Sequence, residues 1–89
     1  MRKRTVPDVW ARAAEYHLND LPGKVRDFRA VDWKILGRTE DSHKQISEAS
    51  VWASITIDEE PHMALVVMQD NVQIHLEEGE SEAPPWKRK

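Results

Sequence analysis

The sequence contains no cysteine, only three glycines, and a single tyrosine and a single phenylalanine. Without cysteine there is no disulfide framework, no thiolate metal site and no thiol nucleophile, so the 89 residues must be stabilised by an apolar core or by a partner chain. The three glycines are too scattered to form a phosphate-binding loop. The length leaves room for one small domain.

Long apolar runs are also missing. The longest, from Met63 to Met68, has six residues, whereas a membrane-spanning helix needs about 20. The start of the chain has the positive charge of a signal peptide, but Asp8, Arg12 and Glu15 fall where the apolar region of such a peptide would lie. We therefore expect a cytoplasmic protein without a membrane span.

The net charge of −3 conceals an uneven distribution. Residues 1–38 carry nine basic and five acidic side chains, whereas residues 39–89 carry four basic and eleven acidic ones. Three of the four basic residues in the second half are the last three of the chain. We expect a basic arm at residues 1–6, a single domain at residues 7–79, and a flexible tail at residues 80–89 that is first acidic and then basic.

An amphipathic helix is predicted near the N-terminus. Apolar side chains recur at helical spacing from Val9 to Leu21, and the following Pro22-Gly23 provides a stop. Thr5 is the expected N-cap, and Pro7 suits the first turn. The helix is expected over about residues 7–20.

After the helix the apolar period changes from 3.6 residues to two, which predicts strands. Alternating or apolar segments occupy residues 29–36, 49–57, 63–68 and 72–77, with turn-forming residues between them. The fold class is therefore α+β: one N-terminal amphipathic helix followed by a three- to four-stranded, mainly antiparallel β-sheet.

Turn lengths decide which side chains share a face of this sheet. A five-residue connection over 58–62 puts Ile55 opposite Leu65. A two-residue turn at Asp70-Asn71 puts Val67 opposite Ile74, and a three-residue turn over 69–71 is the alternative. With the five-residue connection over 58–62, one side of the strand at 63–68 faces the helix. The other side then forms a second apolar face, made of Trp52, Ala64, Val66 and Met68.

One helix covers only one face of a sheet, so a second apolar face needs another cover. We expect a homodimer to provide it, with the four residues of the second face as the interface. A different protein or a small apolar ligand is an alternative cover. So is the chain itself, through the N-terminal arm or the segment from Ala83 to Trp86.

Motifs for catalysis are weak. His75 and Glu77 are two residues apart on one predicted strand, so both side chains can reach the same metal ion. They provide only two ligands, and no spacing typical of a metalloprotease or zinc module accompanies them. We predict no catalytic residue, no metal and no cofactor. A small ligand- or metal-binding enzyme that uses His75 and Glu77 is kept as the second alternative function.

The stretch from Ala64 to Gly79 resembles the strand pair that closes a module in the glyoxalase and bleomycin-resistance family. Proteins of that family need a second strand and helix module to build a paired metal site, and this chain has no such module. The resemblance therefore implies no activity, cofactor or site residue here.

We expect instead a non-enzymatic protein-binding or regulatory module. Acidic residues gather in the sheet half of the chain, and such a surface can engage a basic partner. Alternatively, these acidic residues serve to keep the protein soluble and to protect the edges of the sheet. The predicted acidic surface consists of Asp58, Glu59, Glu60, Glu77 and Glu78.

A nucleic-acid-associated protein is the first alternative function. Basic termini can neutralise phosphates, and an aromatic side chain beside them can stack on a base. The negative net charge argues against this role, because nucleic-acid-binding domains are usually basic. The candidate contacts are Arg2, Lys3, Arg4, Trp86, Lys87, Arg88 and Lys89.

Overall fold

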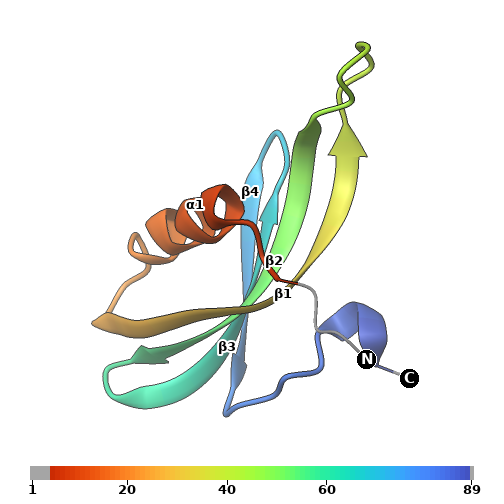
Figure 1. The fold of residues 1–89 in the computed structure, drawn as a ribbon. Helices are drawn as coiled ribbons and strands as arrows, with labels where there is room; N and C mark the ends of the chain where they lie inside the picture. Colours follow the sequence, from red (N-terminus) through yellow and green to blue (C-terminus); the bar gives the residue numbers. More distant parts are fainter. Residues whose placement is uncertain (1–4, 89) are drawn as a thin grey trace.

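The structure is a computed structural model that describes residues 5–88. Helix α1 (Asp8–Leu18) is followed by strands β1 (Val25–Arg38), β2 (Ile46–Ile57), β3 (Glu60–Met68) and β4 (Val72–Glu78), and by a short 3₁₀ helix, η1 (Pro85–Lys87) (Figure 1). The strands form one sheet in the order β1-β2-β3-β4, each antiparallel to its neighbour. The predicted α+β fold with an N-terminal helix is confirmed.

The N-cap of helix α1 lies two residues after the predicted one. Pro7 is the N-cap residue, and its carbonyl accepts hydrogen bonds from the N–H groups of Trp10 and Ala11. Thr5 is therefore not the cap, and no side chain caps the first turn. Ala14 and Leu18 are fully buried against the sheet. Burial of a leucine side chain contributes about 1.5–3 kcal/mol, so Leu18 alone is a substantial anchor for the helix.

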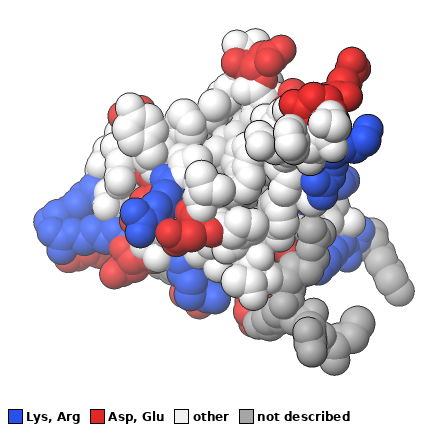
Figure 2. Space-filling model, turned by 45° about the horizontal axis from the view of Figure 1, so that its top comes forward, with Lys and Arg blue, Asp and Glu red and all other residues white. Residues whose placement is uncertain are grey.

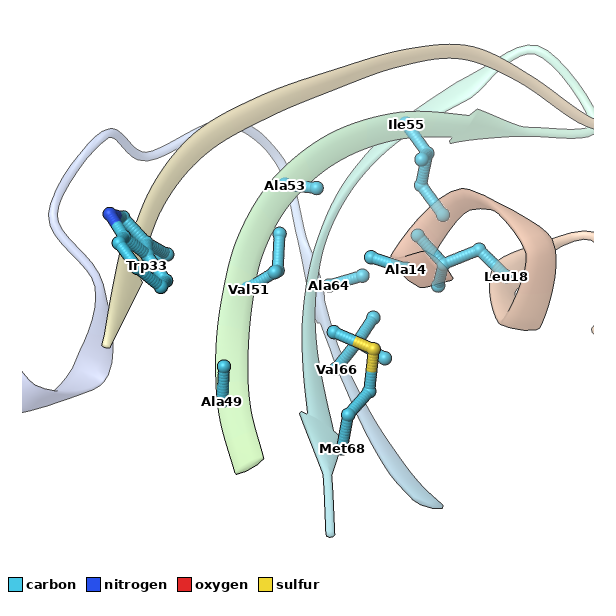
Figure 3. Packing of buried hydrophobic residues seen from close by; sticks show 10 residues of the cluster. All are labelled: Ala14, Leu18, Trp33, Ala49, Val51, Ala53, Ile55, Ala64, Val66 and Met68. Atoms are coloured by element: carbon cyan, nitrogen blue, oxygen red, sulfur yellow. The ribbon is translucent and has the colours of Figure 1, made fainter. Parts of the chain in front are cut away.

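We call the face of the sheet that α1 covers the inner face, and the opposite side the outer face. The helix packs against β1, β2 and β3 (Figure 1). Ala14 and Leu18 of the helix point toward Ile55, Ala64 and Val66 of the sheet, whereas Trp33 and Ala49 lie farther from the helix (Figure 3). Most of the buried side chains from the sheet are small or β-branched. This cluster contains Ala14, Leu18, Trp33, Ala49, Val51, Ala53, Ile55, Ala64, Val66 and Met68.

The turn between β2 and β3 is shorter than predicted. Ile57 pairs with Glu60, so only Asp58 and Glu59 form the turn, and both have positive φ, 50° and 71°. Two residues at positive φ match the twist of a tight hairpin. Pro61 lies inside β3 and pairs with Thr56. The predicted connection over 58–62 included Pro61, and that prediction is wrong because Pro61 is part of the strand.

This shorter turn changes which side chains share a face. Ile55 lies opposite His62 and not opposite Leu65. The observed turn is three residues shorter than the predicted one. Because three is an odd number, every side chain of β3 lies on the face opposite to the predicted one. The predicted second apolar face is therefore wrong: Trp52 stays on the outer face, while the inner face receives Ala64, Val66 and Met68.

The turn between β3 and β4 has three residues, 69–71, as in the alternative register. Met68 pairs with Val72 and Val66 with Ile74. The inner face of β4 therefore carries Val72, Ile74, Leu76 and Glu78, and its outer face carries Gln73, His75 and Glu77.

Strand β1 is longer and less regular than predicted. Its pairing with β2 shifts in several places, so that Ala30 lies opposite Ala53 whereas Asp32 lies opposite Trp52. Val31 is the extra residue between these pairs, and it leaves Asp32 on the outer face beside Trp52. Within residues 5–88 no helix is long and apolar enough to cross a membrane.

Candidate protein-binding surface

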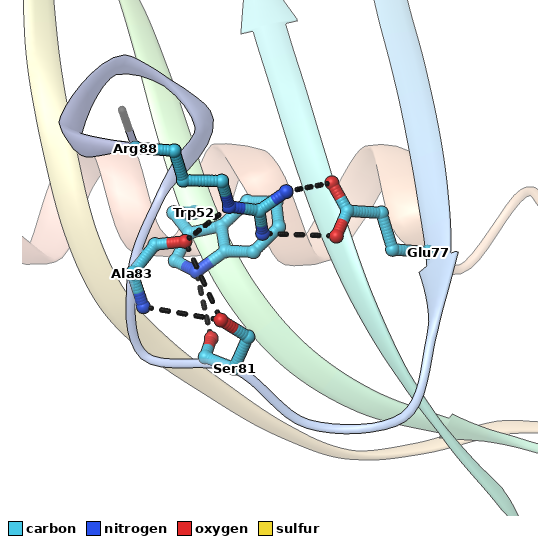
Figure 4. Close-up of polar contacts among 5 residues, drawn as sticks. All are labelled: Trp52, Glu77, Ser81, Ala83 and Arg88. Atoms are coloured by element: carbon cyan, nitrogen blue, oxygen red, sulfur yellow. Dashed lines mark hydrogen bonds and ion pairs between the residues drawn. The ribbon is translucent and has the colours of Figure 1, made fainter.

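The outer face is covered by the end of the same chain. Residues 81–88, which we call the C-terminal clasp, run across this face over Trp52 (Figure 4). The indole Nε1 of Trp52 donates a hydrogen bond of 2.9 Å to the carbonyl oxygen of Ser81. Trp52 and Pro84 are both fully buried. From the sequence, residues 80–89 were expected to form a flexible tail outside the domain. In the structure, residues 81–88 pack on the sheet of that domain.

Arg88 fixes the far end of the clasp. Its guanidinium donates two parallel hydrogen bonds of 2.9 Å to the Glu77 carboxylate and one of 3.0 Å to the carbonyl of Ala83 (Figure 4). The same group lies 5.3 Å from the centre of the Trp52 ring, within the range of a cation–π contact. The hydrogen bonds that Arg88 donates to the Glu77 carboxylate raise the pKa of Arg88 further above its ordinary value, so the guanidinium stays charged.

Lys87 makes the second ionic contact of the clasp. Its Nζ lies 2.8 Å from Oδ2 of Asp32, whose side chain is only 8% exposed. The other carboxylate oxygen accepts a 2.7 Å hydrogen bond from the backbone N–H of Trp33. A buried carboxylate needs such partners, since an unpaired buried charge is costly.

Because the clasp covers the outer face, no partner protein is needed to bury it. Trp52, Ala64, Val66 and Met68 are all buried within one chain, and they do not share one face. Folding back of the segment from Ala83 to Trp86, one of the alternatives considered from the sequence, provides the cover instead. The homodimer stays a prediction, but this face no longer supports it.

Of the predicted nucleic-acid contacts, those that the structure describes contact their own chain. Lys87 and Arg88 neutralise carboxylates of their own chain, and Trp86 is half-buried in η1. The remaining candidates for phosphate contact, Arg2, Lys3, Arg4 and Lys89, lie outside the described residues. His75 is exposed, but Glu77 beside it holds Arg88. In the described part of the chain no three His, Asp or Glu side chains are grouped to hold a metal ion.

Acidic side chains without cationic partners lie at one end of β3 and β4. Among residues 5–88, Glu60 and Glu78 form no ion pair. Together with Pro61, His62 and Gly79 they line a hollow of about 420 Å³, which we call the acidic hollow. Glu59 is exposed in the adjoining turn, and Asp58 accepts a 2.9 Å hydrogen bond from the backbone N–H of Lys24. The predicted acidic surface is thus split, because the Glu77 carboxylate lies on the outer face and is bound by Arg88 of the clasp.

Strand β4 is an edge of the sheet, and its backbone pairing shows which groups point outward. The N–H of Gly79 donates to the carbonyl of Pro61, so this pair is hydrogen-bonded. In an antiparallel ladder the bonded pairs alternate, which means that Glu77, His75 and Gln73 also bond to β3. The N–H and C=O groups that point away from the sheet are therefore those of Val72, Ile74, Leu76 and Glu78.

This edge is regular and partly apolar. The pairing of β4 with β3 runs from His62 and Glu78 to Met68 and Val72 without a shift. Val72 and Leu76 are 40% and 44% exposed because α1 packs over the other three strands. Figure 2 shows a broad area without charged side chains, bordered by acidic and basic side chains that on one side extend well into the visible face.

The open edge was not identified from the sequence. The alternation of Val72, Ile74 and Leu76 predicts a strand. That no other strand within residues 5–88 pairs with the outer edge of β4, and that α1 packs on the other three strands, is seen only in the structure. Comparisons with protein families, with characterised proteins and with solved structures find no match to this chain.

Proposed function

We propose that this protein is a non-enzymatic protein-binding module that pairs the free edge of β4 with an extended segment of a partner protein. The carrying observation is the edge itself, a regular strand whose four outward-facing residues include the partly exposed Val72 and Leu76. Natural proteins usually protect such edges with proline, bulges or a covering element. Strand addition is a common way for a sheet edge to recognise an extended peptide.

The two edges of the sheet differ in this respect. Strand β1 carries several register shifts and a residue at positive φ, Asp27 at 57°. Such irregularities twist an edge and disfavour further pairing. Strand β4 has neither feature between Val72 and Glu78. Among the described residues, the features of β4 that protect an edge are the two acids at its end, Glu77 and Glu78, and Glu77 is bound by Arg88.

Selection from a displayed library of random extended peptides tests the proposal. We expect peptides selected on the natural chain to lose binding to Leu76→Pro, because proline removes an outward N–H and its ring obstructs a neighbouring strand. Leu76→Thr is the matched control, since it keeps the N–H and the strand propensity. Circular dichroism verifies that both variants fold. Peptides that bind Leu76→Pro as well as the natural chain, or an absence of enriched peptides, would overturn the proposal.

A further inference from the structure

The side chains along the β4 edge specify the chemistry of the segment that would pair with it. We infer that β4 binds an antiparallel segment with a basic residue followed by apolar residues at every second position: basic-x-apolar-x-apolar-x-apolar. This inference rests on the proposed strand addition. It adds the composition, direction and register of the ligand.

The pattern follows from the β4 residues whose backbone N–H and C=O groups point to the free edge, because the side chains of these same residues lie on the inner face. In β4 these are, from its C-terminal end, Glu78, Leu76, Ile74 and Val72. An antiparallel strand reads them in this order, and its directly opposite side chains lie on the same face. Three apolar positions therefore meet Leu76, Ile74 and Val72, and they extend the apolar inner face by one strand.

The first position of the segment meets the acidic hollow. Glu78 lies directly opposite, and Glu60, two residues before His62 on the inner side of β3, lines the same hollow of about 420 Å³. Neither carboxylate has an ion-pair partner among the described residues. A lysine or arginine at this position is complementary to both acids, whereas an acidic residue is repelled.

A second copy of β4 fits this edge less well. With Ile74 opposite Ile74 of the second copy, Glu78 lies opposite Asp70 of the second copy, which is a repulsive pair. With Ile74 opposite Leu76 of the second copy, Glu78 lies opposite Val72 of the second copy. Neither register brings a cation to the acidic hollow, so charge complementarity favours a different protein as the partner.

Fluorescence anisotropy with the labelled heptapeptide Lys-Thr-Val-Thr-Ile-Thr-Val-amide tests the inference. We expect the Lys→Gln peptide to bind about fivefold more weakly at low salt, as expected for one cation between two partly solvated acids. The Glu60→Gln/Glu78→Gln protein should lose the preference for lysine. The control variant Glu40→Gln, whose acid lies in the loop between β1 and β2, should retain it.

Backbone methylation of the peptide tests the strand geometry separately. Positions 1, 3, 5 and 7 direct their N–H groups toward β4, so N-methylation at position 5 should weaken binding at least about tenfold, and methylation at position 4 should change it less than about twofold. Equal effects at positions 4 and 5 would overturn strand addition itself. A clear position-5 effect without any preference for lysine would overturn only the inferred ligand. A rise in molecular mass on light scattering in place of peptide binding would identify a second copy as the occupant.

Discussion

Replacement of Trp52 by alanine measures how much the outer face depends on the clasp. The indole is fully buried, donates a 2.9 Å hydrogen bond to Ser81, and lies under the guanidinium of Arg88 at 5.3 Å. Removal of a buried tryptophan costs about 3–5 kcal/mol. A chain of this length has a total stability of about 4–13 kcal/mol, at about 0.05–0.15 kcal/mol per residue. Trp52→Ala is therefore expected to remove a large part of the stability, and a chain near the lower end of this range would be largely unfolded at room temperature.

Urea unfolding followed by far-ultraviolet circular dichroism checks this magnitude. Trp86→Ala serves as the matched control, because Trp86 is only half-buried and its loss should cost clearly less. A chain that ends at Glu80 lacks the clasp and should be destabilised in the same direction as Trp52→Ala. If Trp52→Ala costs less than about 1 kcal/mol and instead lowers the molecular mass on light scattering, Trp52 is an intermolecular contact and the account of the clasp is wrong.

Three further predictions concern single contacts. Lys87→Met should lower the free energy of unfolding by about 1–2 kcal/mol, because Asp32 is left with only the N–H of Trp33 as a partner; an unchanged urea midpoint would show that the 2.8 Å ion pair is not formed in solution. Glu59→Gly should raise stability by about 0.5–1 kcal/mol, since the φ of 71° suits glycine; a loss on thermal unfolding would refute the turn geometry. The hydrogen bond from Thr39, followed by that from the N–H of His43, lowers the pKa of Asp41, so its contribution to stability is complete above its ordinary pKa of 3.8 and is lost as the pH falls through the lower folded value. Amide shifts of His43 and Lys44 should titrate below pH 3.8 in the natural chain and not in Asp41→Asn.

The sequence contains enough information to predict the elements of the fold. Periodicity locates α1 and all four strands, because each has one face that must be buried. Register is harder to predict, since it depends on turn length. Acidic residues before Pro61 are typical of a loop, yet Asp58 and Glu59 adopt positive φ and make a two-residue turn. That difference of three residues moved every side chain of β3 to the opposite face.

The candidate site could be predicted only in part. Glu60 and Glu78 were predicted to be part of an acidic surface. That both line one hollow depends on the register of β3 and β4, which the sequence does not show. The ion pairs from Asp32 to Lys87 and from Glu77 to Arg88 join residues far apart in the sequence or on different elements, and no local pattern marks them. The apolar Pro84 and Trp86 are the one sequence signal that the tail packs on the domain.

Amide mapping by nuclear magnetic resonance would locate the binding of an extended peptide along β4. The isotope-labelled chain is titrated with the Lys-Thr-Val-Thr-Ile-Thr-Val-amide peptide, and backbone shifts are followed across the described residues. If the peptide adds to the edge of β4, we expect saturable shifts that are largest for the outward-facing amides of Val72, Ile74, Leu76 and Glu78, with smaller ones at Glu60. Saturable shifts confined to α1, to β1 or to the clasp would contradict the account, as would the absence of saturable shifts anywhere in the chain.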